Sequence, residues 1–158
     1  MDYGVRALVA LARAEQEQPG VPTKRERLAT SEGIPGKFLD DILRLLRNSG
    51  LVKSHRGPDG GWTLGHPAKD ITVADVIRVL EGPLASVRGI RPDELAADGV
   101  DQPFVDLWVA VRVSLRSVLE EVTLADLATG TLPKKVVRLV DSPGALDAHE
   151  RPGTPKQP

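Results

Sequence analysis

The chain has no cysteine among its 158 residues. Disulfide bonds, thiolate metal sites and a cysteine nucleophile are therefore excluded. Its three histidines, His55, His66 and His149, show no helical spacing between any pair, so they form no recognisable metal triad. None of them stands in the strand-turn-helix context of a nucleophilic hydrolase. We therefore expect neither an enzyme nor a bound metal or cofactor.

Aromatic residues and long apolar runs are also scarce. Aromatics make up 3% of the chain and hydrophobic residues 41%, so the core must consist mainly of aliphatic side chains. No apolar stretch approaches the roughly 18 residues of a membrane span, and no charged start leads into an apolar segment as in a signal peptide. We expect a cytoplasmic protein with no membrane partner, built as one compact domain with an appendage.

The chain as a whole has almost no net charge, but one segment carries an excess of positive charge. The formal net charge is −1. Between Lys24 and Arg56, however, eight Lys and Arg residues accompany four Asp and Glu residues. Any attraction to nucleic acid must therefore be local to this segment.

Residues 28–64 have the pattern of a winged helix-turn-helix. Gly33 can end a first helix, because glycine adopts the left-handed conformation without a Cβ penalty. Thr23 with Glu26 predicts a capping box at the start of that helix. The next helix is predicted over residues 35–48. Its apolar side comprises Phe38, Leu39, Ile42, Leu43, Leu45 and Leu46. Its polar stripe comprises Lys37, Asp40, Asp41, Arg44, Arg47 and Asn48, which is what a recognition helix offers to a major groove.

A β-hairpin is predicted directly after this helix. Residues 52–54 and 62–64 predict its strands, and the sequence HRGPDGG forms the loop between them. Asp59-Gly60-Gly61 would supply the positive φ angles that such a loop needs. A Gly-rich loop could instead hold a phosphate, but that use requires a helix directly after the glycines, where a strand is predicted here.

The sequence IPGKFLDDILRLLRNSGLVKSHRGPDGGWTL resembles the Rrf2 family of bacterial transcriptional regulators. The resemblance is carried by a Gly-Leu-Val turn, an Arg-Gly-Pro-x-Gly-Gly-aromatic wing and a Glu-Gly-Pro sequence at residues 81–83. It implies a mainly α fold in which a winged helix-turn-helix with a small β-hairpin wing is joined to a long C-terminal dimerisation helix. It also implies a homodimer that binds double-stranded DNA at an inverted-repeat operator and represses transcription.

The expected DNA contacts lie on the second helix and the wing. Cations of the polar stripe are candidates for contacts to phosphates or guanine edges. Its two aspartates either accept from a cytosine amine or hold Arg44 by side-chain pairing, and family members commonly carry a carboxylate near Asp40, which favours base selection there. Arg56 would enter the adjacent minor groove, where neighbouring glycines allow close approach. The full set is Lys37, Phe38, Asp40, Asp41, Arg44, Arg47, Ser54, His55, Arg56, Gly57, Gly60 and Gly61.

Further helices are predicted on either side of this unit. Residues 3–14 predict an amphipathic helix that serves as scaffold. Capping boxes at Thr72 with Asp75 and at Thr123 with Asp126 predict two more helix starts.

Residues 84–100 show no sustained periodicity and predict a connector, with one helical turn around residues 93–97. Members of the resembled family often place three cysteines here as ligands of an iron–sulfur cluster. Without thiolates we expect no such cluster in this chain. Val87, Ile90 and Leu95 leave room for a small organic effector, or for no effector at all.

Residues 104–122 carry apolar side chains at spacings of 4, 3, 4, 3 and 4 on a predicted helix of about five turns. This seam could pack onto its own domain. After a flexible connector, however, the chain has too little surface to cover the seam and its apolar neighbours, and family members dimerise through this helix. We predict a homodimer through Phe104, Trp108, Val111, Leu115, Val118 and Val122.

The predicted organisation has four parts. Residues 1–83 form the DNA-binding domain, residues 84–100 the connector, residues 101–130 the dimerisation helix with a short capping helix, and residues 131–158 a largely disordered tail. Within the tail, Lys134 to Arg138 could form a strand or a secondary basic contact. Two alternative functions remain. One is a regulator whose connector and dimer interface bind a small effector that controls its release from DNA. The other is an interaction module that kept the winged fold and lost DNA binding, for which the two aspartates and the near-neutral charge argue.

Overall fold

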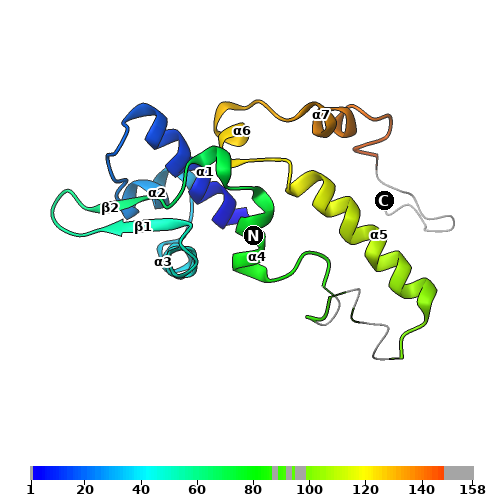
Figure 1. Cartoon of the computed structure of the whole chain (residues 1–158). Helices are drawn as coiled ribbons and strands as arrows, with labels where there is room; N and C mark the ends of the chain where they lie inside the picture. Colours follow the sequence, from blue (N-terminus) through cyan, green and yellow to red (C-terminus); the bar gives the residue numbers. More distant parts are fainter. Residues whose placement is uncertain (1, 87–88, 92–93, 95–98, 148–158) are drawn as a thin grey trace, which may run out of the picture.

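A computed structural model describes residues 2–86, 89–91, 94 and 99–147 of the chain. It contains α1 (Asp2–Glu17), α2 (Arg25–Glu32), α3 (Gly36–Asn48), β1 (Val52–His55), β2 (Gly61–Leu64), the 3₁₀ helix η1 (Ala68–Asp70), α4 (Val73–Glu81), α5 (Gln102–Leu119), α6 (Leu124–Thr129) and α7 (Lys134–Val140). The β1–β2 hairpin and α5 project from opposite sides of the helical core (Figure 1). Within the described residues, none of the helices combines the length and apolar character needed to cross a lipid bilayer.

Several helices begin and end at the predicted signals. The Thr72 hydroxyl accepts from the Asp75 backbone N–H at 3.2 Å, and the Asp75 carboxylate accepts from the Thr72 backbone N–H at 3.0 Å, which completes the predicted capping box of α4. The same reciprocal pair, Thr123 with Asp126, begins α6. Gly33 ends α2 with a φ of 62°, so its predicted left-handed role is confirmed.

The prediction of a capping box from Thr23 to Glu26 is wrong. α2 begins one residue later, with Lys24 in the N-cap position, where a lysine side chain has no acceptor to offer. Thr23 forms a β-bridge with Trp62, in which each backbone N–H donates to the other residue's carbonyl at 2.9 Å. This bridge keeps Thr23 extended and ties the segment before α2 to the hairpin.

The core is aliphatic, as the low aromatic content predicts, and α1 packs against α2, α3, α4, β2 and α6. The helix α3 contributes Leu39, Leu43 and Leu46 to this core, at helical spacing. Burying each of these side chains stabilises the fold by about 1.5–3 kcal/mol. Two residues predicted on this buried side, Phe38 and Leu45, are exposed instead, Phe38 by 61%. They lie on the flank of a buried stripe that is narrower than the apolar pattern of the sequence.

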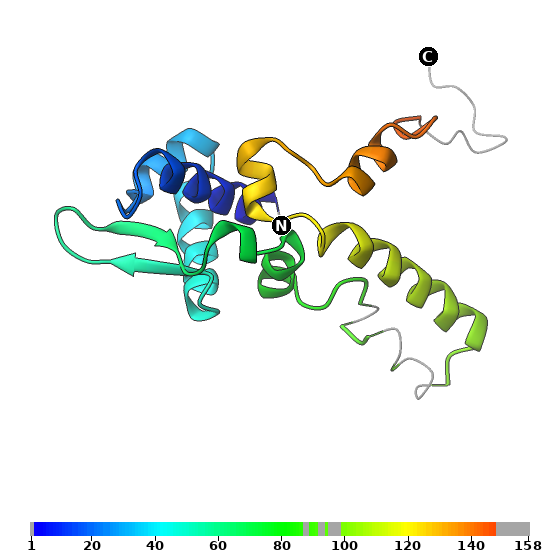
Figure 2. The same ribbon diagram turned by 45° about the horizontal axis from the view of Figure 1, so that its top comes forward.

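The helix α5 leaves this core and extends away from it in both views (Figures 1 and 2). Its C-terminal end is tied to α4 through Glu120, which accepts from Arg78 and, at 2.9 Å, from Arg116. The hydrogen bond from Arg116, with that from Arg78, holds the pKa of the Glu120 carboxyl below its ordinary value. These contacts connect the C-terminal end of α5 to α4.

One residue of the predicted seam is misplaced. α5 ends at Leu119, and Val122 follows in the turn before α6. Val122 is only 5% exposed, and its carbonyl accepts from the Val73 N–H at 2.9 Å. The prediction that Val122 continues the seam on the same helix is therefore wrong, because this residue lies beyond α5 and is buried in its own chain next to the start of α4.

The C-terminal segment differs from the prediction as well. The strand considered for residues Lys134 to Arg138 is not formed, because these residues lie in the helix α7, in which Val136 is buried. The basic contact considered for them stays a prediction. The predicted tail therefore begins with a helix. Sequence periodicity did not indicate this helix, because seven residues span too few turns to show a clear period. Residues 148–158 lie outside the described residues, as does the predicted turn at residues 93–97 except for Glu94.

Candidate nucleic-acid interface

The helix α3 lies beside the hairpin in both views (Figures 1 and 2). A tight turn joins the two elements: Gly50 has a φ of 80°, and the Leu51 N–H donates to the Leu46 carbonyl at 2.9 Å. All residues of the predicted polar stripe are exposed, namely Lys37, Asp40, Asp41, Arg44, Arg47 and Asn48. The exposed stripe and the wing therefore belong to adjacent elements of the fold.

The hairpin has the predicted strands with one more residue on each. Its antiparallel register runs from Val52 opposite Leu64 to His55 opposite Gly61. The His55 Nε2 lies 2.9 Å from the Thr63 hydroxyl across the strands, so one ring nitrogen is already engaged. Three wing residues predicted as DNA contacts, Ser54, His55 and Arg56, are exposed.

The prediction that Asp59, Gly60 and Gly61 supply positive φ angles is wrong. In this loop it is Gly57 that has a positive φ, of 102°. A Cβ on Gly60 would collide with the backbone carbonyl of His55, and a Cβ on Gly61 would lie 2.5 Å from the carbonyl oxygen of Thr23. These two glycines permit close approach, but to the chain's own backbone.

The two aspartates of α3 are both paired. Arg25, at the start of α2, donates from Nε and Nη2 to the two carboxylate oxygens of Asp40, the second bond measuring 2.8 Å. The hydrogen bond from Arg25 holds the pKa of the Asp40 carboxyl below its ordinary value. Asp41 accepts from Arg44 Nη2 at 3.4 Å, so the predicted pairing with Arg44 is present for Asp41. The same pairing predicted for Asp40 is wrong, because Arg25 on the neighbouring helix engages that carboxylate instead.

Pairing leaves this part of the surface positively charged. The other acidic residues of the basic segment also have arginine partners, since Glu26 lies 3.7 Å from Arg25 and Glu32 lies 3.4 Å from Arg6. In the part of the chain that the structure describes, the following cations of the segment have no carboxylate partner: Lys24, Lys37, Arg47, Lys53 and Arg56. Unpaired cations on a helix and an adjacent wing are what a phosphate backbone attracts.

A groove of about 330 Å³ runs between the start of α2 and the wing. Lys24, Arg25 and Glu26 line one side, and Ser54, His55, Gly57 and Trp62 are among the residues of the other. Lys24 and Arg25 were not predicted as candidate contacts. The sequence signal that could have identified them is the pair of adjacent cations, Lys24 and Arg25. It is overlooked when this segment is interpreted as a capping box.

The remaining seam residues lie along α5. Phe104 and Leu115 are 44% and 41% exposed, and the rings of Phe104 and Trp108 are tilted against each other with centroids 6.2 Å apart. Trp108, Val111 and Val118 are half-buried. The indole N–H of Trp108 is buried and finds no acceptor within the described residues.

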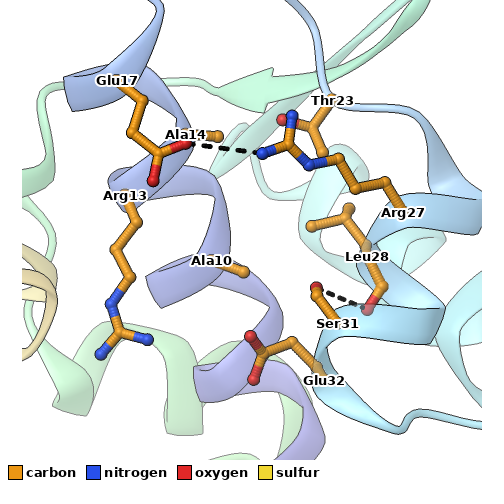
Figure 3. Close-up of a pocket in the computed structure, with 9 residues that line it drawn as sticks. All are labelled: Ala10, Arg13, Ala14, Glu17, Thr23, Arg27, Leu28, Ser31 and Glu32. Atoms are coloured by element: carbon orange, nitrogen blue, oxygen red, sulfur yellow. Dashed lines mark hydrogen bonds and ion pairs between the residues drawn. The ribbon is translucent and has the colours of Figure 1, made fainter.

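A smaller cavity of about 140 Å³ lies between α1 and α2 (Figure 3). Its charged side chains already have partners in the chain. Arg27 lies 3.5 Å from Glu17 across the cavity, Glu32 pairs with Arg6, and Arg13 donates to carbonyls of α6. These contacts connect α1 to α2 and α6. The charged side chains around the cavity are therefore explained by contacts between helices, without a ligand.

Metal ligands are not gathered anywhere in the described residues: no three His, Asp or Glu side chains lie together in a geometry that could hold an ion. With no cysteine in the chain, thiolates for an iron–sulfur cluster cannot come from it. Of the residues predicted to leave room for a small effector, Val87 and Leu95 lie outside the described residues.

Residues 1–130 match the family model Rrf2, described as an iron-dependent transcriptional regulator. The chain is 49% identical over 140 residues to a candidate HTH-type transcriptional regulator of Mycobacterium tuberculosis (strain H37Rv), which covers 89% of this chain and 85% of that protein. It is 36% identical over 129 residues to the HTH-type transcriptional regulator CymR of Bacillus subtilis, covering 82% and 86% of the two chains.

Solved structures agree with these sequence matches. The structure of CymR, the global cysteine regulator of B. subtilis, matches with a TM-score of 0.68 at 35% identity, over 82% of this chain and 93% of that chain. A T. potens IscR structure matches with a TM-score of 0.65 at 33% identity, over 82% of each chain. Their likeness to this chain confirms the predicted mainly α fold with a hairpin wing.

Proposed function

Since this chain belongs to the Rrf2 family of DNA-binding transcriptional regulators, we propose that it acts as a homodimeric repressor at an inverted-repeat operator. Members of this family are regulators and not enzymes, and double-stranded DNA is the partner that the family implies. Its place of action is then the cytoplasm, where bacterial DNA lies.

The observation that carries the proposal is the set of unpaired cations on α3 and the wing. α3 would enter a major groove with Lys37 and Arg47 toward phosphates or guanine edges, and Phe38 would offer an apolar contact to a thymine methyl group. Arg56, the first residue after β1, would reach the adjacent minor groove. Gly57, with its positive φ, turns the loop next to Arg56.

The homodimer would form through the exposed apolar residues of α5. A helix that projects from its domain with Phe104 and Leu115 more than two-fifths exposed leaves apolar area that a second copy can cover. A two-fold axis through such an interface places two recognition helices on one face of the duplex, so the operator should be an inverted repeat.

We propose further that regulation does not use a cysteine-ligated iron–sulfur cluster. The donor set of the chain does not fit that group, because every thiolate ligand is missing. The family description as iron-dependent therefore does not transfer to this chain through the usual ligands.

The test is the salt dependence of DNA binding, measured by fluorescence anisotropy with a duplex selected by the protein from a random pool. Phosphate contacts release counterions, so affinity should fall by about 10³-fold or more between about 50 and 200 mM salt if some six or more phosphates are contacted. A scrambled duplex of the same composition is the control and should bind much more weakly. Affinity that stays flat across this range would contradict the proposal and favour an interaction module.

A further inference from the structure

One side-chain bridge connects the two helices of the helix-turn-helix on the proposed DNA side. Arg25 is the first residue of α2, and Asp40 lies in the second turn of α3. Two guanidinium nitrogens donate to the two carboxylate oxygens, so the contact is bidentate and fixes both side chains in one orientation. Both residues are substantially exposed, so the pair belongs to the surface and not to the core.

The backbone at the start of α3 is shaped to accept this bridge. A Cβ on Gly36 would lie 2.6 Å from Arg25 Nη2 and 3.4 Å from its Cζ, so the guanidinium lies directly against this glycine. Gly36 has no left-handed φ, so what it provides is space. Any larger residue here would displace the end of the Arg25 side chain, which is flexible, while the helix itself could stay in place.

The bridge changes what Asp40 can do beside DNA. A lone carboxylate on a recognition helix repels phosphates and can rotate freely, whereas a carboxylate paired with a guanidinium is neutralised locally and held in position. Each oxygen of Asp40 keeps a further lone pair that can accept a hydrogen bond. The neighbouring pair of Asp41 with Arg44 has one longer contact of 3.4 Å within a single helix, so it constrains its carboxylate much less.

We propose that Arg25 is a positioning residue that holds the Asp40 carboxylate for base selection, and that Gly36 supplies the space this arrangement needs. The inference rests on the proposed DNA-binding function and adds a specific dependence to it. Base preference at one operator position should require Arg25 and a small residue at position 36, although neither needs to contact that base.

The experiment begins with a duplex that the wild-type protein selects from a random pool. Affinities for this duplex and for all of its single-base-pair substitutions are then measured by fluorescence anisotropy for the wild type and for Asp40→Asn, Arg25→Gln, Gly36→Ala and the double variant Arg25→Gln/Asp40→Asn. Arg27→Gln is the matched control. It removes a cation from the same helix, but this cation pairs with Glu17 on α1 and not with Asp40. Comparing ratios between duplexes cancels the general effect of a lost charge on affinity.

Asp40→Asn should remove a preference of about tenfold at one base pair, the size expected for one good side-chain contact to a base. Arg25→Gln and Gly36→Ala should remove the same preference, and the double variant should lose no more than the single ones. Arg27→Gln should keep the preference. Gly36→Ala should also keep or raise the thermal unfolding temperature, because alanine favours a helix over glycine, which separates lost positioning from lost folding.

A second readout follows the pair itself. Carboxyl NMR titration should give a pKa for Asp40 that rises in Arg25→Gln and Gly36→Ala but not in Arg27→Gln, because the hydrogen bond from Arg25 keeps it low. If Arg25→Gln and Gly36→Ala keep the wild-type base preference, the positioning role is wrong while DNA binding stands. If Asp40→Asn also keeps it, Asp40 selects no base. If the wild type selects no sequence from the pool, the proposed function itself fails.

Discussion

At the scale of single residues, charge pairing within the chain decides which side chains are available to DNA. The carboxylates of Asp40 and Asp41 are both occupied by arginines, so their repulsion of phosphates is reduced. Lys37, Arg47 and Arg56 have no such partner in the described part of the chain. A surface with paired anions and unpaired cations can attract a polyanion although the whole chain has a net charge of −1.

Arg56 provides the simplest test at this scale. Arg56→Ala should lower affinity for the selected duplex by about tenfold and reduce the salt slope by about one, because one contact to DNA is lost. Arg138→Ala, which removes an exposed cation from α7, is the matched control and should leave both quantities unchanged. Titrations at several salt concentrations measure both. Equal effects of the two variants would mean that the wing makes no specific contact.

Residue-scale predictions from sequence succeeded where the signal was local. The capping boxes at Thr72 and Thr123 depend on residues three positions apart, and both are present. Thr23 fails as a cap because Trp62, far along the chain, engages its backbone. Arg25 was missed as a partner of Asp40 for the same reason, since the two residues are fifteen positions apart on different helices.

At the scale of elements, α5 has apolar residues on more sides than its own domain covers. Phe104 and Leu115 lie on the predicted seam, and Val113, on the opposite side of the helix, is 58% exposed. Sequence periodicity found the helix and its apolar character. It could not show that Val122 lies beyond the last turn, nor that Phe38 stands on the exposed flank of α3, because both depend on how neighbouring elements pack.

Leu115→Glu tests the seam, because it places a charge in the middle of the predicted interface and in a side chain that its own domain leaves 41% exposed. The dimer dissociation constant should rise by about 30-fold or more, the effect of losing about 2 kcal/mol at a central contact. Sedimentation equilibrium measures this constant, and circular dichroism checks that helix content is unchanged.

Val113→Glu is the matched control and should leave the dimer intact. If Val113→Glu dissociates the dimer and Leu115→Glu does not, the subunits meet through the other side of α5. If neither variant has an effect, the interface lies elsewhere on the chain.

At the scale of the whole molecule, the absence of cysteine separates this chain from the iron-dependent description of its family. Protein purified without oxygen from an iron-replete host should be colourless, and its affinity for the selected duplex should not change on exposure to air or nitric oxide. Absorption spectroscopy with iron and sulfide analysis measures the first, and anisotropy measures the second. A visible absorption band with stoichiometric iron and sulfide would show that other ligands hold a cluster.

The central claim is that two copies of this winged helix-turn-helix bind one operator together, and the most direct measurement is the composition of that complex. Sedimentation velocity with a labelled duplex selected from a random pool gives the number of chains bound. We expect two chains per duplex and a selected sequence that is an inverted repeat, with half-site centres about 10–10.5 base pairs apart or a multiple of that distance. One chain per duplex, or a selected sequence without two-fold symmetry, would contradict it.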